Sequence, residues 1–139
     1  MLELNSLKQA VESLDALLQK TLDEKFMSQL DDTTSYGLKA GVIQNFEFTY
    51  ELCWKFMKRW LENNLGNTYV EGVTRRELFR LAVEHHLIDR IELWMDYHYA
   101  RNETTHTYDR DKADQVFAVA QTFLHDAKKL LKNLEHNND

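Results

Sequence analysis

Apolar residues recur every three or four positions along most of this chain, a spacing that gathers them on one face of a helix. The first apolar stripe runs from Leu4 to Phe26, and the last runs from Val116 to Leu134. The predicted helices cover residues 2–30, about 36–63, about 74–85, about 88–101 and about 109–134. We therefore expect a protein built of helices joined by short connections.

Polar residues and glycine separate these stripes. Residues 31–35 are Asp-Asp-Thr-Thr-Ser, whose side chains compete for backbone hydrogen bonds and favour turns. Gly66 lies among asparagines and predicts the end of the second helix, because Gly and Asn tolerate left-handed backbone geometry. Thr74 and Glu77 have the spacing of a capping box, in which the Thr hydroxyl bonds the Glu77 amide and the Glu carboxylate reaches back.

The composition supports long helices in a single domain. The chain has 139 residues, no proline and four glycines. Its length suits one domain, and the scarcity of helix-breaking residues permits long helices. We predict one domain over residues 1–139, an all-α antiparallel four-helix up-and-down bundle with an additional short helix. The first and last stripes serve either the core of a monomer or the interface of a homodimer.

Charge and cysteine content exclude several classes of protein. The net charge of −6 argues against a chain that is basic all over and binds nucleic acid through its whole surface. The single cysteine, Cys53, excludes an internal disulfide or a multi-cysteine metal site, and its apolar surroundings predict burial. No apolar run is long enough for a membrane helix, and no signal peptide is visible. We expect a cytoplasmic protein.

Several other polar and aromatic positions leave alternatives open. Glu92 and Asp96 share a helix face, but no matching pair is evident on another helix, so we predict no metal or cofactor site. Glu47 and Glu51, with Lys55 four residues further, form either a solvated ladder of ion pairs or a face that borders the functional segment or a partner.

The aromatic residues also divide into two groups. Trp54 and Trp60 are predicted to lie in the core, whereas Trp94 is less clear because charged residues are near it in the sequence. Tyr97 and Tyr99 are expected either to stack on a nucleotide base or to pack in the core or a dimer contact.

The segment from Arg101 to Tyr108 carries the most distinctive chemistry. It is rich in Asn and Thr, which are weak helix formers, so the fourth helix should end after about Arg101. If the backbone then becomes extended, His106 and Tyr108 point the same way, because alternate residues share a face in extended chain. The plain alternative is a polar turn in which Arg101 pairs with Glu103 or Asp109.

Arg, His and Tyr together suit chemistry on a phosphodiester. His exchanges protons near neutral pH, and the planar guanidinium of Arg matches phosphate geometry. An Arg–His pair could cleave RNA without a metal: His106 would activate the 2′-hydroxyl or protonate the leaving oxygen, and Arg101 would stabilise the added charge. Tyr108 could donate a hydrogen bond or act as a nucleophile that accepts a group.

The string Arg101-x4-His106-x-Tyr108 resembles the R-x4-H-x-Y motif of HEPN-domain proteins of the HepT type. The block from Val42 to Lys55 resembles the second-helix signature of the small bacterial nucleotidyltransferase substrate-binding proteins, a branch of the same superfamily. This resemblance covers nearly the whole chain, from about Leu7 to Leu134. It implies a helical-bundle homodimer that binds a small nucleotidyltransferase encoded nearby.

The same resemblance implies roles for the motif residues. In related toxin–antitoxin pairs this type of protein is a metal-independent ribonuclease, with its Arg and His brought together across the dimer. By position, Arg101 and His106 would be catalytic and Asn102 would support the site. Tyr108 would accept AMP from the nucleotidyltransferase, and this modification would silence the ribonuclease. The alternative is a non-catalytic accessory subunit that binds nucleotide or substrate for the nucleotidyltransferase.

Overall fold

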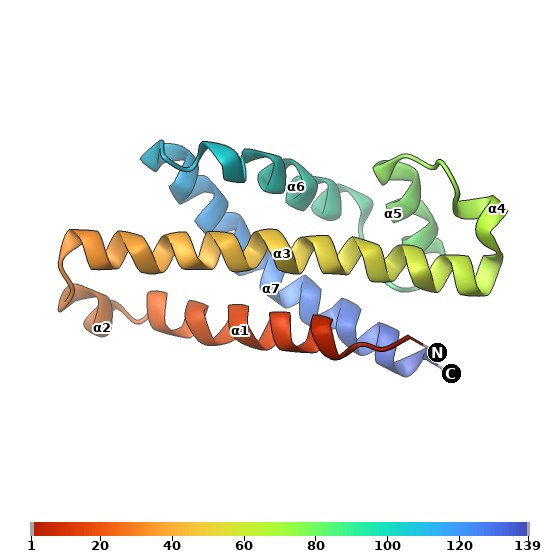
Figure 1. Cartoon of the computed structure of the whole chain (residues 1–139), viewed down its shortest axis with the longest axis horizontal. Helices are drawn as coiled ribbons and strands as arrows, with labels where there is room; N and C mark the ends of the chain where they lie inside the picture. The colour runs from red at the N-terminus through yellow and green to blue at the C-terminus, as the bar shows by residue number, and fades with distance from the viewer. Residues whose placement is uncertain (1, 139) are drawn as a thin grey trace.

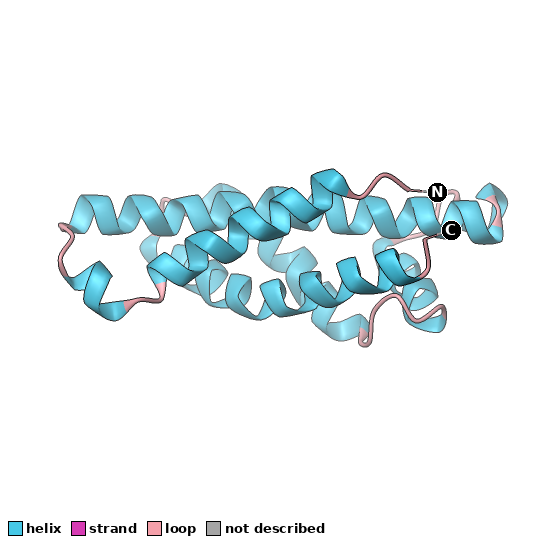
Figure 2. Ribbon diagram, turned by 90° about the horizontal axis from the view of Figure 1, so that it is seen from below, coloured by secondary structure: helices cyan, strands magenta, loops and turns pink. Residues whose placement is uncertain are grey.

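The computed structural model describes residues 2–138, and that part of the chain contains helices and no strand. The elements are α1 (Asn5–Thr21), α2 (Glu24–Ser28), α3 (Asp32–Leu65), α4 (Asn67–Val70), α5 (Arg75–Glu84), α6 (Ile91–Asn102), the 3-10 helix η1 (Glu103–His106) and α7 (Arg110–His136). In Figure 1, α1 and α6 run in one direction and α3 and α7 in the other. The predicted all-α bundle is therefore confirmed, and Figure 2 shows how short most of its connections are.

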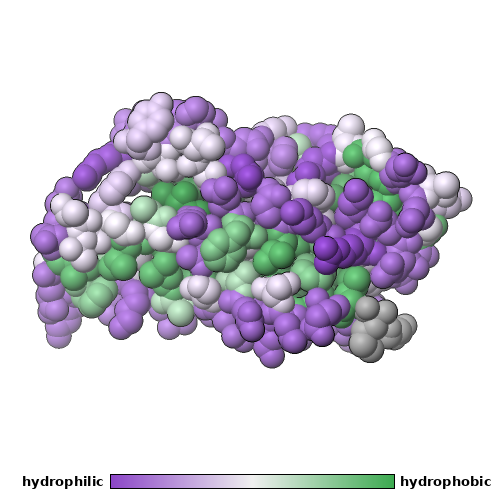
Figure 3. All heavy atoms as spheres, viewed as in Figure 1, coloured by the Kyte–Doolittle hydropathy of each residue, from purple (hydrophilic) through white to green (hydrophobic). Residues whose placement is uncertain are grey.

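The longest helix, α3, lies at the centre of the bundle and packs against α1, α5, α6 and α7. Its buried residues keep the three-or-four spacing and include Cys53, whose burial was predicted. Phe123 of α7 packs edge-on against Phe46 of α3, with ring centroids 5.0 Å apart, and its ring also contacts Tyr50, Trp94 and Tyr97. Polar side chains cover most of the face in Figure 3, but apolar ones show through along α3.

The first predicted helix is interrupted in the structure. We expected one helix over residues 2–30, but α1 ends at Thr21 and α2 begins at Glu24. The side chain of Asp23 accepts a hydrogen bond from the Phe26 amide at 3.0 Å, so it caps a new helix. Leu22, which continues the apolar stripe in the sequence, is 50% exposed. A capping residue therefore overrides the periodic pattern here.

The polar residues at 31–35 begin a helix rather than separating two. Asp31 accepts a hydrogen bond from the Thr34 amide at 2.7 Å, and α3 starts at Asp32, earlier than the predicted position near 36. At the other end, Gly66 has a φ of 96° and follows the last residue of α3. The predicted stop at Gly66 is confirmed because its backbone geometry is one that favours glycine.

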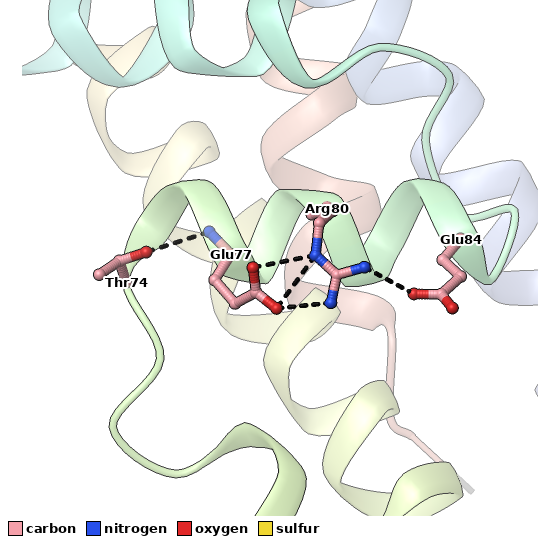
Figure 4. A network of polar contacts seen from close by, with 4 residues as sticks. All are labelled: Thr74, Glu77, Arg80 and Glu84. Atoms are coloured by element: carbon pink, nitrogen blue, oxygen red, sulfur yellow. Dashed lines mark hydrogen bonds and ion pairs between the residues drawn. The ribbon is translucent and has the colours of Figure 1, made fainter.

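The capping box at the start of α5 is half formed. The Thr74 hydroxyl accepts a hydrogen bond from the Glu77 amide at 3.1 Å, as predicted. The Glu77 carboxylate does not reach back to Thr74 in the structure but binds Arg80, which also contacts Glu84 (Figure 4). A guanidinium three residues away is the stronger donor, so it takes the carboxylate.

Two further expectations are corrected. Helix α6 begins at Ile91, later than predicted, because the backbone of Arg90 before it is extended, and Leu87 and Ile88 are buried in the preceding turn. Trp94 is the buried tryptophan at 2% exposure, whereas Trp54 and Trp60 are half-buried. Within residues 2–138, no helix is both long and apolar enough to cross a membrane.

Candidate functional site

The backbone between α6 and α7 is held in place by threonine hydroxyls. Helix α6 ends at Asn102, within one residue of the predicted position. The Thr104 hydroxyl donates to the Arg101 carbonyl at 2.8 Å, and the Thr107 hydroxyl donates to the Thr104 carbonyl at 3.1 Å. The Tyr36 hydroxyl of α3 donates to the Thr107 carbonyl at 2.6 Å. The junction is therefore an anchored structure.

The backbone of this junction is helical rather than extended. The sequence left open an extended backbone after Arg101, but residues Glu103–His106 form a 3-10 helix. Thr104 is buried at 8% exposure, which favours a tight local turn over an open strand-like segment. Asp109 then accepts a hydrogen bond from the Asp111 amide at 2.9 Å and caps α7.

Arg101 points toward α3 and is held there by two carboxylates. Its Nε donates to Glu51 Oε1 at 2.7 Å, and its Nη2 lies 3.6 Å from Glu47 Oε1. The arginine side chain is 29% exposed, as is that of Glu51. The two glutamates are four residues apart on α3 and so face the same way. The open question about these glutamates is thereby answered: their face borders the motif.

The alternative of a polar turn, in which Arg101 pairs with Glu103 or Asp109, is wrong about these partners. Glu103 pairs with Lys112 of α7 at 2.9 Å, and the hydrogen bond from that ammonium holds the pKa of the Glu103 carboxyl below its usual value. Asp109 caps α7. Both proposed turn partners are therefore committed elsewhere, and Arg101 is free to bind α3.

His106 and Tyr108 lie on the exposed side of the junction. Their ring centroids are 6.3 Å apart with an interplanar angle of 74°, an edge-to-face arrangement. Tyr108 is 83% exposed, and His106 and Asn102 are also exposed. No hydrogen bond or ion pair joins Arg101 to His106 within residues 2–138 of this single chain. The fold thus brings two of the three motif residues together and points the third toward α3.

A groove of about 370 Å³ lies between α6 and α7, next to the motif. Ala100, Val116 and Val119 supply apolar surface, and Tyr99 and Glu103 also line it. Tyr99 is 54% exposed, whereas Tyr97 is buried at 1% and bonds Asp126. The sequence left the same two roles open for both tyrosines, and the structure separates them. Tyr97 belongs to the core, and Tyr99 is accessible to a ligand or partner.

Sequence reasoning missed a second set of polar residues beside Arg101. His98 lies one turn earlier on α6, where its Nδ1 is 3.0 Å from the Tyr50 hydroxyl of α3. Arg75 of α5 donates to the same hydroxyl at 3.3 Å and lies over the Trp54 ring. The spacing of three residues between His98 and Arg101 was a usable signal. The contact of Arg75, which lies on another helix, could not be predicted from the sequence.

The polar groups of the site suit phosphate chemistry. A guanidinium, an exposed imidazole and an exposed phenol supply a fixed positive charge, a group that can transfer a proton and a nucleophile. No group of three or more His, Cys, Asp or Glu side chains that could hold a metal ion is found in the described residues. Glu92, considered above as a ligand, is paired with Arg76.

Comparison with known proteins identifies the family of this chain. Residues 2–136 match the family model described as "Nucleotidyltransferase substrate binding protein like". The chain is 36% identical over 138 residues to a protein of Haemophilus influenzae named "Probable ribonuclease HepT", an alignment that covers 99% of this chain and 94% of that protein.

Two solved structures share the fold. A Haemophilus influenzae structure described as the substrate binding domain of a nucleotidyltransferase superposes with a TM-score of 0.93 and 34% identity, covering 96% of this chain and 99% of that one. A Thermus thermophilus structure has a TM-score of 0.69 at 24% identity, covering 90% of this chain and 98% of that one, and shows the fold alone. This chain therefore belongs to the nucleotidyltransferase substrate-binding-protein-like family, the HepT-like branch of the HEPN superfamily.

Proposed function

We propose that this chain is the HEPN-type partner of a small nucleotidyltransferase and that, when unmodified, it is a metal-independent endoribonuclease. The observation that carries the proposal is the geometry of the motif: Arg101 is held by Glu51 and Glu47, while His106 and Tyr108 lie exposed side by side. A ribonuclease of this kind needs a fixed charge for the phosphoryl group and an accessible group that moves a proton.

The proposed reaction uses only groups of this protein and its substrate. The ribose 2′-oxygen attacks phosphorus and the bond to the 5′-oxygen breaks, giving a 2′,3′-cyclic phosphate and a 5′-hydroxyl. His106 accepts the 2′-hydroxyl proton or supplies a proton to the leaving 5′-oxygen, and Arg101 stabilises the charge on the phosphoryl oxygens. Because one chain does not bring Arg101 to His106, we propose that a homodimer supplies the two groups from different protomers.

Tyr108 is proposed as the switch of a toxin–antitoxin module. Its phenol oxygen would attack the α-phosphorus of ATP, losing its proton and releasing pyrophosphate, in the active site of the nucleotidyltransferase. At 83% exposure the phenol is accessible to a second protein. The attached AMP would add bulk and negative charge beside the His106 ring, only 6.3 Å away between centroids, and so exclude an RNA phosphate.

A cleavage assay with EDTA present tests the activity. We expect the wild-type chain to cut RNA and His106→Ala to cut it at least roughly a hundredfold more slowly, the usual contribution of a proton-transferring group. His125→Ala is the matched control, because His125 is an exposed histidine of α7 away from the motif. The proposal fails if the wild-type chain leaves RNA intact, or if the two variants behave alike.

Intact mass after incubation with the neighbouring nucleotidyltransferase and ATP tests the switch. We expect an AMP-sized gain in the wild type, no gain in Tyr108→Phe, and an unchanged gain in Tyr69→Phe. Tyr69 is a suitable control because it is 71% exposed and lies in the distant α4. A gain that persists in Tyr108→Phe would show that another residue accepts the group.

The groove between α6 and α7 favours a second function, that of an accessory subunit that binds nucleotide without catalysis. Its apolar surface and the exposed Tyr99 could hold a base, and Glu103 at its edge could accept from an exocyclic amine. Under this function Tyr99→Ala weakens ATP binding by the complex with the nucleotidyltransferase, and the isolated wild-type chain leaves RNA intact.

A further inference from the structure

Four side chains from three helices meet one turn before Arg101, and the proposed reaction uses none of them. They are His98 of α6, Tyr50 and Trp54 of α3, and Arg75 at the start of α5. The guanidinium carbon of Arg75 lies 3.7 Å from the centroid of the Trp54 ring, and its Nη1 donates to the Tyr50 hydroxyl at 3.3 Å. We call these four residues the Arg75 cluster.

Arg75 differs from the ion-paired arginines because no carboxylate neutralises it. Arg76, Arg80, Arg101 and Arg110 each lie within 4.0 Å of an Asp or Glu, whereas no such pair involves Arg75 in residues 2–138. An aromatic face and a phenol hold Arg75 instead, and they fix its plane while leaving its charge unpaired. In a chain with a net charge of −6, this is a positioned positive charge with free N–H groups.

The hydrogen-bond donors and acceptors of the cluster assign a tautomer to His98. Arg75 can only donate, so the Tyr50 oxygen accepts from it. The hydrogen of the Tyr50 hydroxyl then has one described acceptor, Nδ1 of His98 at 3.0 Å. The other ring nitrogen, Nε2, therefore carries the proton of a neutral imidazole. Burial and the charges of Arg75 and Arg101 lower the pKa of His98, with Glu51 opposing them, and this agrees with a neutral ring.

The Arg75 cluster is joined to the motif through α3. Trp54 Nε1 donates to Glu51 Oε2 at 3.1 Å, while the other oxygen of that carboxylate accepts from Arg101 at 2.7 Å. Trp54, whose ring contacts Arg75, is thus hydrogen-bonded to Glu51, which binds Arg101. Trp54 and Glu51 are three residues apart on α3 and so share a helix face, and each of them contacts one of the two guanidinium groups.

We infer that Arg75 and His98 form a second phosphate-binding site, which holds a backbone phosphate of the RNA strand adjacent to the phosphate at Arg101. Arg75 supplies charge and paired N–H donors in a fixed plane. His98 supplies a neutral Nε2–H donor whose direction is set by Tyr50. This inference rests on the proposed ribonuclease function for the identity of the strand, and it assigns the Arg75 cluster a role in holding that strand.

Binding of a non-cleavable RNA tests the inference without any need for catalysis. The probe is a fluorescently labelled oligoribonucleotide with 2′-O-methyl groups throughout, and the readout is anisotropy at several salt concentrations. We expect Arg75→Gln to weaken binding about tenfold and to reduce the slope of log K against log salt by about 0.7, the loss of one phosphate contact to a single strand. Arg75→Lys should recover part of the affinity.

Arg59→Gln is the matched control. Arg59 also lies over an aromatic ring, that of Phe56 at 5.3 Å, and no carboxylate pairs with it in the described chain. It lies eight residues beyond Glu51 on α3, about 12 Å further along the helix. We expect its affinity and salt slope to match the wild type within twofold. Far-UV circular dichroism of each variant shows whether it is folded.

Each outcome bears on the inference separately from the proposed activity. A wild-type chain that binds the probe through Arg75 but cleaves no RNA would support the site and refute the activity. Equal affinities for wild type and Arg75→Gln, or no binding of the probe by the wild type, would overturn the inference. Loss of ATP affinity in Arg75→Gln with unchanged RNA affinity would also overturn it, because the phosphate would then come from a nucleotide.

Discussion

The two ends of the motif are built in opposite ways. Arg101 lies on a regular helix, is 29% exposed, and has its direction set by Glu51, fifty residues earlier in the chain. His106 ends a 3-10 helix and Tyr108 lies two residues after it. Their rings contact each other. The backbone beneath them is nevertheless tied to α3 by Tyr36.

Under the proposed function, this difference divides the tasks of the site. A group that stabilises charge gains from being fixed in advance, because no reorganisation is then needed when the charge develops. A group that is to be modified by a second protein has to be reachable from solvent. The fold fixes Arg101 through tertiary contacts and presents His106 and Tyr108 on an anchored backbone, so both requirements are met within one short segment.

The largest expected effect comes from removing the support behind the Arg101 end. Phe123 is buried and its ring contacts Phe46 and Tyr50 of α3 and Trp94 and Tyr97 of α6, so it joins α7 to both helices. We expect Phe123→Ala to lower the free energy of unfolding by about 3–5 kcal/mol. Urea unfolding followed by circular dichroism measures this change.

A surface phenylalanine serves as the control for this loss. Phe48 of α3 is 41% exposed, so Phe48→Ala is expected to cost less than about 1 kcal/mol. Similar losses in the two variants would mean that the aromatic cluster around Phe123 does not hold the helices together. The contrast between a motif end fixed by side-chain packing and an end with exposed side chains would then be lost.

The next effect concerns the bond that directs Arg101. A double-mutant cycle with Arg101→Ala and Glu51→Ala should give a coupling of about 1 kcal/mol, near the upper end for ion pairs that retain some exposure. The pair between Arg80 and Glu84 is the reference, because its side chains are 50% and 57% exposed, and its coupling should be about 0.3 kcal/mol. Equal couplings would indicate that α3 does not orient Arg101.

Periodicity and capping chemistry were enough to predict most of the fold, because those signals are local. The all-α bundle, the stop at Gly66 and the end of α6 all follow from short-range patterns. The break at Asp23 was missed because a cap and an apolar stripe compete there, and the sequence does not state which prevails. The partners of Arg101 were also missed, since a contact fifty residues away depends on how α6 packs on α3.

A smaller effect should appear as a pH dependence of stability. The pKa of His98 is lowered in the folded chain, first by burial and then by Arg75 and Arg101. Below the ordinary value of 6.5, the unfolded chain takes up a proton that the folded chain resists, so stability falls as pH decreases, until the folded His98 titrates as well. We expect this component to be absent in His98→Gln.

Unfolding free energies of wild type and His98→Gln between about pH 5 and about pH 8 isolate this component from the other histidines. The difference between the two proteins should be constant at the alkaline end and should shift in favour of His98→Gln at the acid end. Curves that stay parallel over the whole range would show that His98 is not held neutral, and the protonation state assigned to the Arg75 cluster would be wrong.

The smallest effects are expected at the exposed end of the motif. The Tyr108 phenol has no hydrogen-bond partner in residues 2–138, so Tyr108→Phe and His106→Ala should each change the free energy of unfolding by less than about 0.5 kcal/mol. Tyr97→Phe is the contrasting variant, because its buried hydroxyl bonds Asp126 and its loss should cost about 1–2 kcal/mol. Thermal unfolding of all three variants measures the difference. A loss at Tyr108 as large as that at Tyr97 would mean that the phenol is part of the fold's own support, and a side chain with that role could not be modified without unfolding the junction.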